Sequence, residues 1–272
     1  MAREYLGQAI ALYREEDHRE MPQETGLEAQ SYMALTLWQL GMIDTARAQS
    51  KAAIAHAERL GKPFALAHTR YFASHLNVML RNPVACQKIA ELGIEQAQEQ
   101  SLALFLHIFR MLRGWALAQQ GHCEEGIASA RAGLASFKAE GYGLSIGGFL
   151  GFLAEAIAQG GEMAEALATV EEGISAMGDQ MIDRPHLLWL RGEFQTRQSA
   201  VELAEASFRE SIAVANHLGA RTLALRASTS LGRLLAAQGR KDEARGVVAP
   251  ILREFTEGFD TRDLIEAKEI GG

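Results

Sequence analysis

Apolar residues recur every three or four positions along most of the chain, and short polar breaks separate the apolar runs. This spacing places apolar side chains on one face of a helix. The runs are rich in Ala, Leu, Glu, Gln and Arg, which favour helices, and no stretch predicts a convincing strand. The pattern therefore predicts an all-α protein.

The breaks between paired helices fall at nearly constant intervals. Landmarks align at Gly41, Leu80, Gly121, Gly161, Ser199 and Gly239, which are 39, 41, 40, 38 and 40 residues apart. Such a period is typical of a helical solenoid, in which each repeat buries its apolar face only against its neighbours. The helix pairs are expected at about 27–40 with 43–60, 62–80 with 83–100, 101–120 with 123–139, 143–160 with 163–177, 183–198 with 201–217, and 219–238 with 241–257.

The segments outside these pairs complete a single domain over 1–272. Residues 1–26 are expected to form a half-repeat and a polar loop over 14–26, because Ala2, Leu6 and Ala9 have the spacing of a second helix without a first. This half-repeat is either a cap or the start of a piece cut from a longer polypeptide. Residues 258–272 form a C-terminal tail with a short helix, and Pro250 falls inside the last helix of the sixth pair, where it would bend that helix.

Small residues occupy two fixed positions in each repeat, and helices approach closely only where side chains are small. Seven positions before the landmark lie Ala34, Ala73, Gly114, Ala154, Gly192 and Gly232, and five positions after it lie Ala46, Ala85, Gly126, Ala166, Ala204 and Ala244. The two helices of each pair are therefore expected to pack at these residues.

These positions resemble the tetratricopeptide repeat, whose second helix carries Ala-x3-Phe-x2-Ala. The best match is the stretch AEASFRESIAVA, where Ala204 and Phe208 take the first two of these positions. The resemblance covers nearly the whole chain, although each copy is degenerate and the period exceeds the usual length of about 34 residues. It implies a right-handed α-solenoid of about six hairpins, whose first helices line a concave groove that binds a protein or peptide.

Three stretches resemble a narrower group of proteins. Residues 244–270, together with 61–76 and 113–128, look like the C-terminal arrays of bacterial signalling proteins that join a nucleotide cyclase, a signal-transduction ATPase and tetratricopeptide repeats. The resemblance implies a position at the C-terminus of such a polypeptide, or a stand-alone relative. It carries neither enzymatic activity over to this chain, which contains neither catalytic part.

Composition narrows the class of partner. The chain has 27 basic and 34 acidic residues, a net charge of −7 and no basic block, which argues against nucleic-acid binding. Its most apolar stretch, 145–158, is too short for a bilayer span and contains Glu155. Two unpaired cysteines and the lack of a signal peptide favour the cytoplasm.

The motifs of common catalytic and metal sites are missing or out of context. No Gly-x4-Gly-Lys-Ser/Thr loop or His-Glu-x2-His pair occurs, so neither a cofactor nor a metal is expected. Residues 143–147 satisfy Gly-x-Ser-x-Gly, but a hydrolase needs a strand before the serine, and this stretch instead predicts a turn between repeats. The sequence indicates a protein that is not an enzyme.

Candidate binding residues follow from the tetratricopeptide pattern, in which positions thirteen, ten, six, three and two before the landmark face the groove. Transferred to this chain, the pattern selects Trp38, Arg70, Asn77, Trp115, Gln119, Glu155, Gln159, Trp189, Glu193, Arg197, Arg226 and Arg233. Trp and Arg are enriched at binding hot spots, which favours a recognition surface, but tryptophan also fills cores. The acidic residues at 155 and 193 and the basic residues at 226 and 233 predict a groove with one acidic and one basic end, suited to a dipolar peptide.

The leading interpretation is a protein- or peptide-binding scaffold or sensor of a bacterial signalling or regulatory system. Two alternatives stay open: a domain that senses a small molecule, and a structural spacer for a larger cyclase or ATPase polypeptide that self-associates, for example as a homodimer through an exposed solenoid edge.

Overall fold

A computed structural model describes residues 1–18, 24–143, 145–178 and 181–272. Within these ranges every regular element is a helix. The contacts group the chain into two compact units, one of residues 1–38 and 42–142 and the other of residues 39–41 and 143–272. The single domain over 1–272 therefore stays a prediction.

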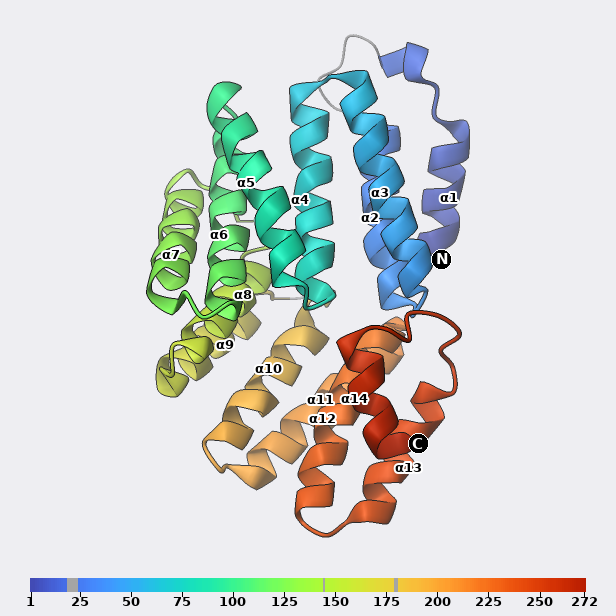
Figure 1. The fold of residues 1–272 in the computed structure, drawn as a ribbon, viewed down its shortest axis with the longest axis vertical. Helices are drawn as coiled ribbons and strands as arrows, with labels where there is room; N and C mark the ends of the chain where they lie inside the picture. The colour runs from blue at the N-terminus through green and yellow to red at the C-terminus, as the bar shows by residue number, and fades with distance from the viewer. Residues whose placement is uncertain (19–23, 144, 179–180) are drawn as a thin grey trace. The chain divides into compact units, whose positions relative to one another are not determined.

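The first unit consists of helix hairpins (Figure 1). Its α-helices are α1 (Ala2–Leu12), α2 (Thr25–Gln39), α3 (Ile43–Leu60), α4 (Pro63–Met79), α5 (Pro83–Glu99), α6 (Ala103–Gln119) and α7 (Cys123–Ala139), with a short 3-10 helix at Glu15–His18. Helix α6 packs against both α5 and α7, and it also contacts α4. The first helices of successive hairpins therefore lie side by side.

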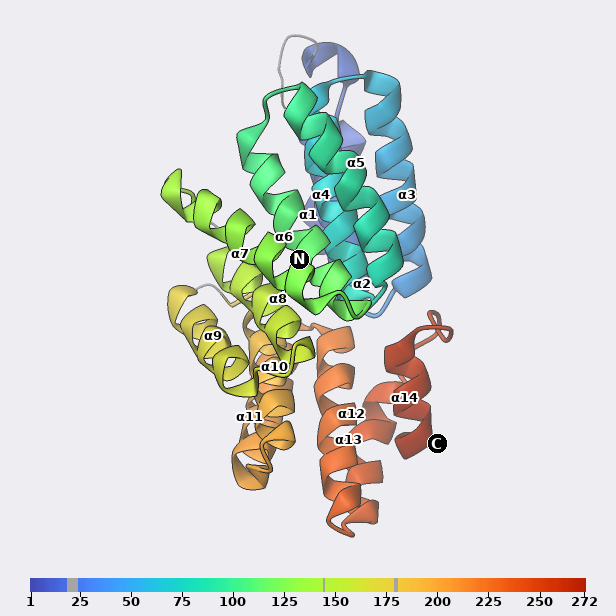
Figure 2. The same ribbon diagram turned by 60° about the vertical axis from the view of Figure 1, so that its left-hand side comes forward.

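The second unit repeats this arrangement (Figure 2). Its helices are α8 (Ile146–Gln159), α9 (Met163–Ala176), α10 (Arg184–Arg197), α11 (Val201–Leu218), α12 (Arg221–Ala237), α13 (Lys241–Leu252) and α14 (Arg262–Gly271). Helix α10 contacts α8 and α12, and α14 packs on α12 and α13. The row α8, α10, α12 and α14 is named the first-helix face of this unit.

The six predicted helix pairs are confirmed with small shifts at their ends. The largest shift is in the last pair, where α13 ends at Leu252 and not at 257, two residues beyond its internal Pro250. The short C-terminal helix is confirmed as α14. The predicted loop over 14–26 was too long, because a 3-10 helix occupies Glu15–His18 and α2 begins at Thr25; residues 19–23 lie outside the described ranges.

The contact between α6 and α7 shows most clearly why the predicted helix-contact positions need small residues. A Cβ added to Gly114 would lie 2.5 Å from the carbonyl oxygen of Gly126, and one added to Gly126 would lie 2.6 Å from that of Gly114. Both positions therefore face the backbone of the partner helix, where even a methyl group does not fit.

The landmark between the paired helices is a residue with left-handed backbone. Positive φ angles occur at Gly41, Arg81, Gly121, Gly161, Ser199 and Gly239. In five of these turns the following N–H donates to the carbonyl five residues earlier, as Asn82 does to Asn77 and His122 does to Leu117, which is the bond of a Schellman motif. The second landmark is thus Arg81 and not Leu80. The predicted register of α4 was wrong by one residue, or about 100° around the helix.

Candidate functional site

Trp189 is at the centre of the first-helix face of the second unit. Its ring is 7% exposed, and its indole N–H donates to Ser230 Oγ over 2.9 Å. The guanidinium of Arg226 lies 5.2 Å from the ring centroid, and the imidazole of His186 stacks at 5.5 Å. Trp189 thereby connects α10 to α12 through polar and aromatic contacts. Its ring is part of the buried layer beneath the exposed side chains of this face.

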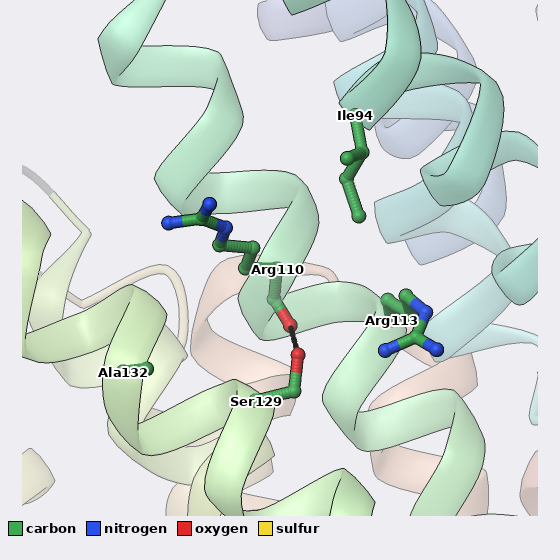
Figure 3. A pocket seen from close by; sticks show the side chains of 5 residues that line it. All are labelled: Ile94, Arg110, Arg113, Ser129 and Ala132. Carbon is green, nitrogen blue, oxygen red and sulfur yellow. Dashed lines mark hydrogen bonds between the residues drawn. The ribbon is translucent and has the colours of Figure 1, made fainter. Parts of the chain in front are cut away.

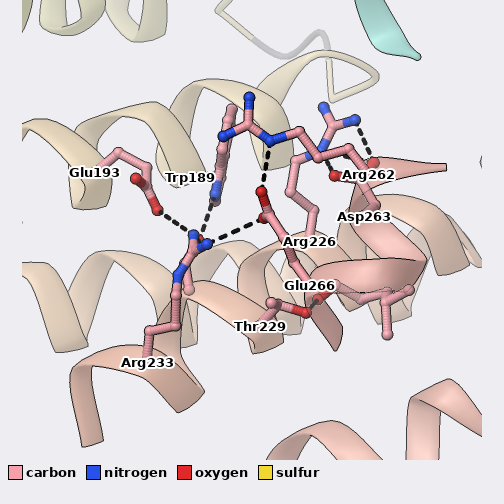
Figure 4. Close-up of polar contacts among 10 residues, drawn as sticks. Trp189, Glu193, Arg226, Thr229, Arg233, Arg262, Asp263 and Glu266 are labelled. Atoms are coloured by element: carbon pink, nitrogen blue, oxygen red, sulfur yellow. Dashed lines mark hydrogen bonds and ion pairs between the residues drawn. The ribbon is translucent and has the colours of Figure 1, made fainter. Parts of the chain in front are cut away.

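Arg226 is itself buried, with 3% exposure, and it pairs with Asp263 of α14. Its Nη2 donates to Asp263 Oδ2 over 2.6 Å, and its Nε donates to Oδ1 over 3.1 Å (Figure 4). A planar guanidinium facing a carboxylate through two nitrogens gives a strong, directional ion pair. The pair fixes the C-terminal helix against α12.

Charged side chains of both signs lie above this buried layer. Arg233 bridges Glu193 of α10 at 3.5 Å and Glu266 of α14 at 3.0 Å, and Arg262 donates to the same Glu266 over 2.6 Å (Figure 4). Arg233 is 45% exposed, so this layer is open to solvent. The predicted basic end of the groove needs correction, because carboxylates of α14 balance Arg226 and Arg233.

His186 and two acidic groups extend the face toward α8. His186 is 3% exposed, and its Nε2 lies 3.2 Å from Glu155 Oε1. Burial raises the pKa of Asp183, and the charge interaction with His186 partly opposes this increase. Beyond these groups, the side chains of Gln159 and Arg197 are exposed near the ends of α8 and α10. No described carboxylate pairs with Arg197.

The predicted residues of the second unit therefore come together. Trp189, Glu193, Arg226 and Arg233 form one contact network, Glu155 joins it through His186, and Gln159 and Arg197 lie at its exposed margin. The predictions missed His186, Asp263 and Glu266. His186 lies thirteen positions before Ser199, where the family pattern already points, but nothing in the sequence pairs α14 with α12.

The predicted residues of the first unit are distributed differently. Trp38 and Trp115 are only 2% and 1% exposed, so both rings lie in the core, which favours the core-filling interpretation for them. Gln119 is partly exposed near the end of α6. Two of the chain's three tryptophans thus have no surface for a ligand in the described structure.

Arg70 and Asn77 do not face inward. They were selected by counting from Leu80, which is one residue before the left-handed Arg81, so the prediction points to the wrong face of α4. Arg70 donates to Gln96 Oε1 of α5 over 3.0 Å and lies 3.9 Å from Glu58 of α3, so it faces the second helices. Asn77 donates to the carbonyl of Ala73 in its own helix. Counting from the left-handed Arg81 instead selects His68, Tyr71 and His75.

A pocket of about 300 Å³ lies in the first unit among α5, α6 and α7 (Figure 3). Ile94, Arg110, Arg113, Ser129 and Ala132 line it. Arg113 is neutralised by Glu125 at 2.6 Å and Glu91 at 3.6 Å, whereas no described carboxylate pairs with Arg110. The guanidinium groups point away from each other in Figure 3, so the pocket has no convergent pair of cations.

The motifs weighed for metal binding and catalysis can be compared with the described residues. Among the described residues no three His, Cys, Asp or Glu side chains are placed to hold a metal ion. Ser145 of the Gly-x-Ser-x-Gly stretch immediately precedes α8, and no strand precedes it among the described residues; Leu144 lies outside them. None of the described helices combines the length and apolar character needed to cross a bilayer.

Comparisons with known proteins place the fold in the tetratricopeptide class of helical repeats. No family model matches the sequence, and no curated protein matches it. Similar solved structures include a Rap protein complexed with competence and sporulation factor, with 12% identity and a TM-score of 0.67 over 98% of this chain and 77% of that one. NprR in complex with its cognate peptide NprX is 12% identical, with a TM-score of 0.64 over 98% and 75%.

A third similar structure relates to the narrower resemblance seen in the sequence. It is a signal transduction ATPase with numerous domains from Pyrococcus horikoshii, which carries a tetratricopeptide repeat sensor. It is 13% identical with a TM-score of 0.53, and the match covers 98% of this chain but 38% of that one. At these identities the similarities establish the fold class alone.

Proposed function

We propose that the protein is a non-enzymatic, cytoplasmic peptide-binding module of a bacterial signalling or regulatory system. The observation that carries this proposal is the layered first-helix face of the second unit. There a buried Trp189 and a buried ion pair support a charged layer in which Arg233 is exposed and Glu193 and Glu266 are partly exposed. A rigid surface with fixed positive and negative groups loses little entropy when it binds an extended peptide.

The similar structures support the same class of ligand. NprR was solved with its cognate peptide, and the Rap protein was solved with competence and sporulation factor. The sensor repeats of the ATPase from Pyrococcus horikoshii support a sensing role within a larger signalling system. A shared fold does not determine the ligand, so peptide binding is tested directly.

The experiment selects peptides from a random display library on the full chain and measures their affinities by fluorescence polarisation. The test variant is Glu193→Gln/Arg197→Gln, which removes one charge of each sign from the first-helix face. The matched control is Glu202→Gln/Arg245→Gln, which makes the same change at exposed positions of α11 and α13. Net charge is the same in both variants, and circular dichroism checks that each keeps the wild-type helix content.

The proposal predicts that the test variant binds the selected peptides about tenfold more weakly, which corresponds to about 1.4 kcal/mol. The control is expected to bind within about twofold of the wild type, because exposed charges far from a contact contribute little. Failure to enrich any peptide, or equal losses in both variants, would overturn the proposal.

A further inference from the structure

The first unit carries a cluster of aromatic rings on α2, α4 and α6, here named the aromatic patch. Its members are Tyr32, Phe64, His68, Phe72 and Phe105. Ring centroids lie 4.5 Å apart for Tyr32 and Phe72, 4.7 Å for His68 and Phe72, and 5.1 Å for Phe64 and Phe105. Tyr32 is 48% exposed, although the rings of Phe72 and Phe105 below it are buried. The patch therefore presents the half-exposed ring of Tyr32 to solvent, packed on aromatic rings that are partly or fully buried.

A carboxylate that has no cationic partner among the described residues lies beside this patch. Glu28 is one turn before Tyr32 on α2, and no described Lys, Arg or His forms an ion pair or hydrogen bond with it. Partial burial raises the pKa of Glu28, and its negative charge contributes to the raised pKa of Tyr32. By contrast, Glu193 and Glu266 in the second unit each form an ion pair with Arg233. An unpaired, partly desolvated carboxylate is a favourable position for an incoming cation.

The histidine of the patch adds no positive charge at neutral pH. Burial lowers the pKa of His68 to about 4, so its imidazole is neutral at pH 7. Its buried Nδ1 has no hydrogen-bond partner. The faces of the aromatic rings carry negative electrostatic potential, which attracts cations. The ring faces and Glu28 thus both favour a positively charged ligand, and none of the five residues of the patch carries a positive charge at neutral pH that would repel it.

We infer that the aromatic patch and Glu28 bind the cationic end of a lysine or arginine side chain of a bound peptide. This inference rests on the proposed function because it takes the ligand to be a peptide, and it adds a specificity site on the first unit. The cation would lie over Tyr32 and approach the Glu28 carboxylate, and its alkyl stem would cover the neighbouring ring edges. Contacts between a cation and aromatic rings at partly exposed sites strengthen binding by about twofold to thirtyfold.

The experiment uses side-chain probes, so it does not depend on finding the natural peptide. The full chain, labelled for detection of aromatic side-chain resonances, is titrated with Nα-acetyl-lysine amide and with Nα-acetyl-norleucine amide. The two probes share an alkyl stem, and only the first has an ammonium group. The variants are Glu28→Gln and Tyr32→Leu. The control is Glu95→Gln, which removes an exposed carboxylate of α5 in the same unit that forms no ion pair with any described residue.

The expected result is a saturable shift of the Tyr32 and His68 resonances with the lysine probe, at least threefold tighter than with the norleucine probe. Glu28→Gln is expected to remove most of this difference and Tyr32→Leu to abolish binding, while Glu95→Gln leaves both affinities unchanged. Equal affinities for the two probes, or no saturable shift with either, would overturn the inference.

The outcome also separates this inference from the proposed function. If display peptides bind but their affinities do not depend on Glu28 or on a basic residue, the peptide function stands and the cation site fails. If the lysine probe binds at Tyr32 but no peptide is enriched, the cation site stands as an amine-binding site and the peptide function fails. Both variants change exposed or partly exposed positions, and circular dichroism checks that each has the wild-type helix content.

Discussion

Removing the carboxylate of Asp263 should destabilise the C-terminal end of the second unit strongly. In the wild type this carboxylate accepts from Nε and Nη2 of Arg226, and both side chains are at most 6% exposed. In Asp263→Ala the guanidinium keeps its charge but loses its counterion and its acceptors. Breaking a buried ion pair by removing one partner costs about 3–5 kcal/mol, because the remaining charge is buried without compensation.

The assay is urea unfolding of the full chain followed by circular dichroism, with the free energy of unfolding compared between variants of equal m-value. The control is Glu254→Ala, which breaks an ion pair of Arg221 at 3.1 Å with both side chains more than half exposed. Exposed pairs contribute about 0–1 kcal/mol, so this variant should unfold almost as the wild type does.

A third variant separates the effect of charge from a general loss of packing. Replacing both partners in Arg226→Met/Asp263→Leu removes the charges together, and apolar replacements of similar volume are often neutral or stabilising. The double variant should therefore recover most of the stability lost in Asp263→Ala. If Asp263→Ala costs less than about 1 kcal/mol, or if the double variant is less stable than the single one, the pair does not hold α14 in the way described.

Three further results are expected. Gly114→Ala should destabilise the first unit by about 1–3 kcal/mol or more, measured by thermal unfolding, because the new methyl group would meet backbone of α7 at 2.5 Å. The pKa of His68 is about 4 in the folded chain against 6.5 when unfolded, so its neutral form stabilises the fold above pH 6.5 and this contribution is lost as the pH falls toward 4. His68→Gln should accordingly flatten the pH dependence of unfolding between these values by up to a few kcal/mol, and an unchanged profile would contradict the burial. Burial also raises the pKa of the Cys86 thiol, so a thiol reagent should modify Cys123 quickly in the native chain and Cys86 only after unfolding.

Much of the fold follows from local regularities of the sequence. The 40-residue period, the helix-forming composition and the small residues at fixed positions predicted all six hairpins, and the contact of Gly114 with Gly126 shows why those positions must be small. The period is misread at one of the two landmarks that lack a glycine. Arg81 adopts the left-handed conformation without being a glycine, and the sequence pattern points to Leu80 instead, whereas Ser199 is identified correctly by its spacing.

The candidate site was predictable where the repeat pattern alone determines which residues face inward. Glu193 and Arg233 each lie six positions before their landmarks, and they meet across α10 and α12 as that spacing implies. The partners supplied by α14 were not predictable, because this helix lies outside the period and no repeat position gives its orientation. Burial of Trp38 and Trp115 also depends on how adjacent helices pack, which a pattern on one helix does not contain.

The most direct test of the central claim is hydrogen–deuterium exchange with and without a peptide selected on the full chain. Backbone amides exchange more slowly where a ligand stabilises local structure. We expect protection in α8, α10 and α12 around Trp189 and Arg233, and unchanged exchange rates in α9, α11 and α13. Protection confined to α9, α11 and α13 would place binding on the second helices and contradict the account.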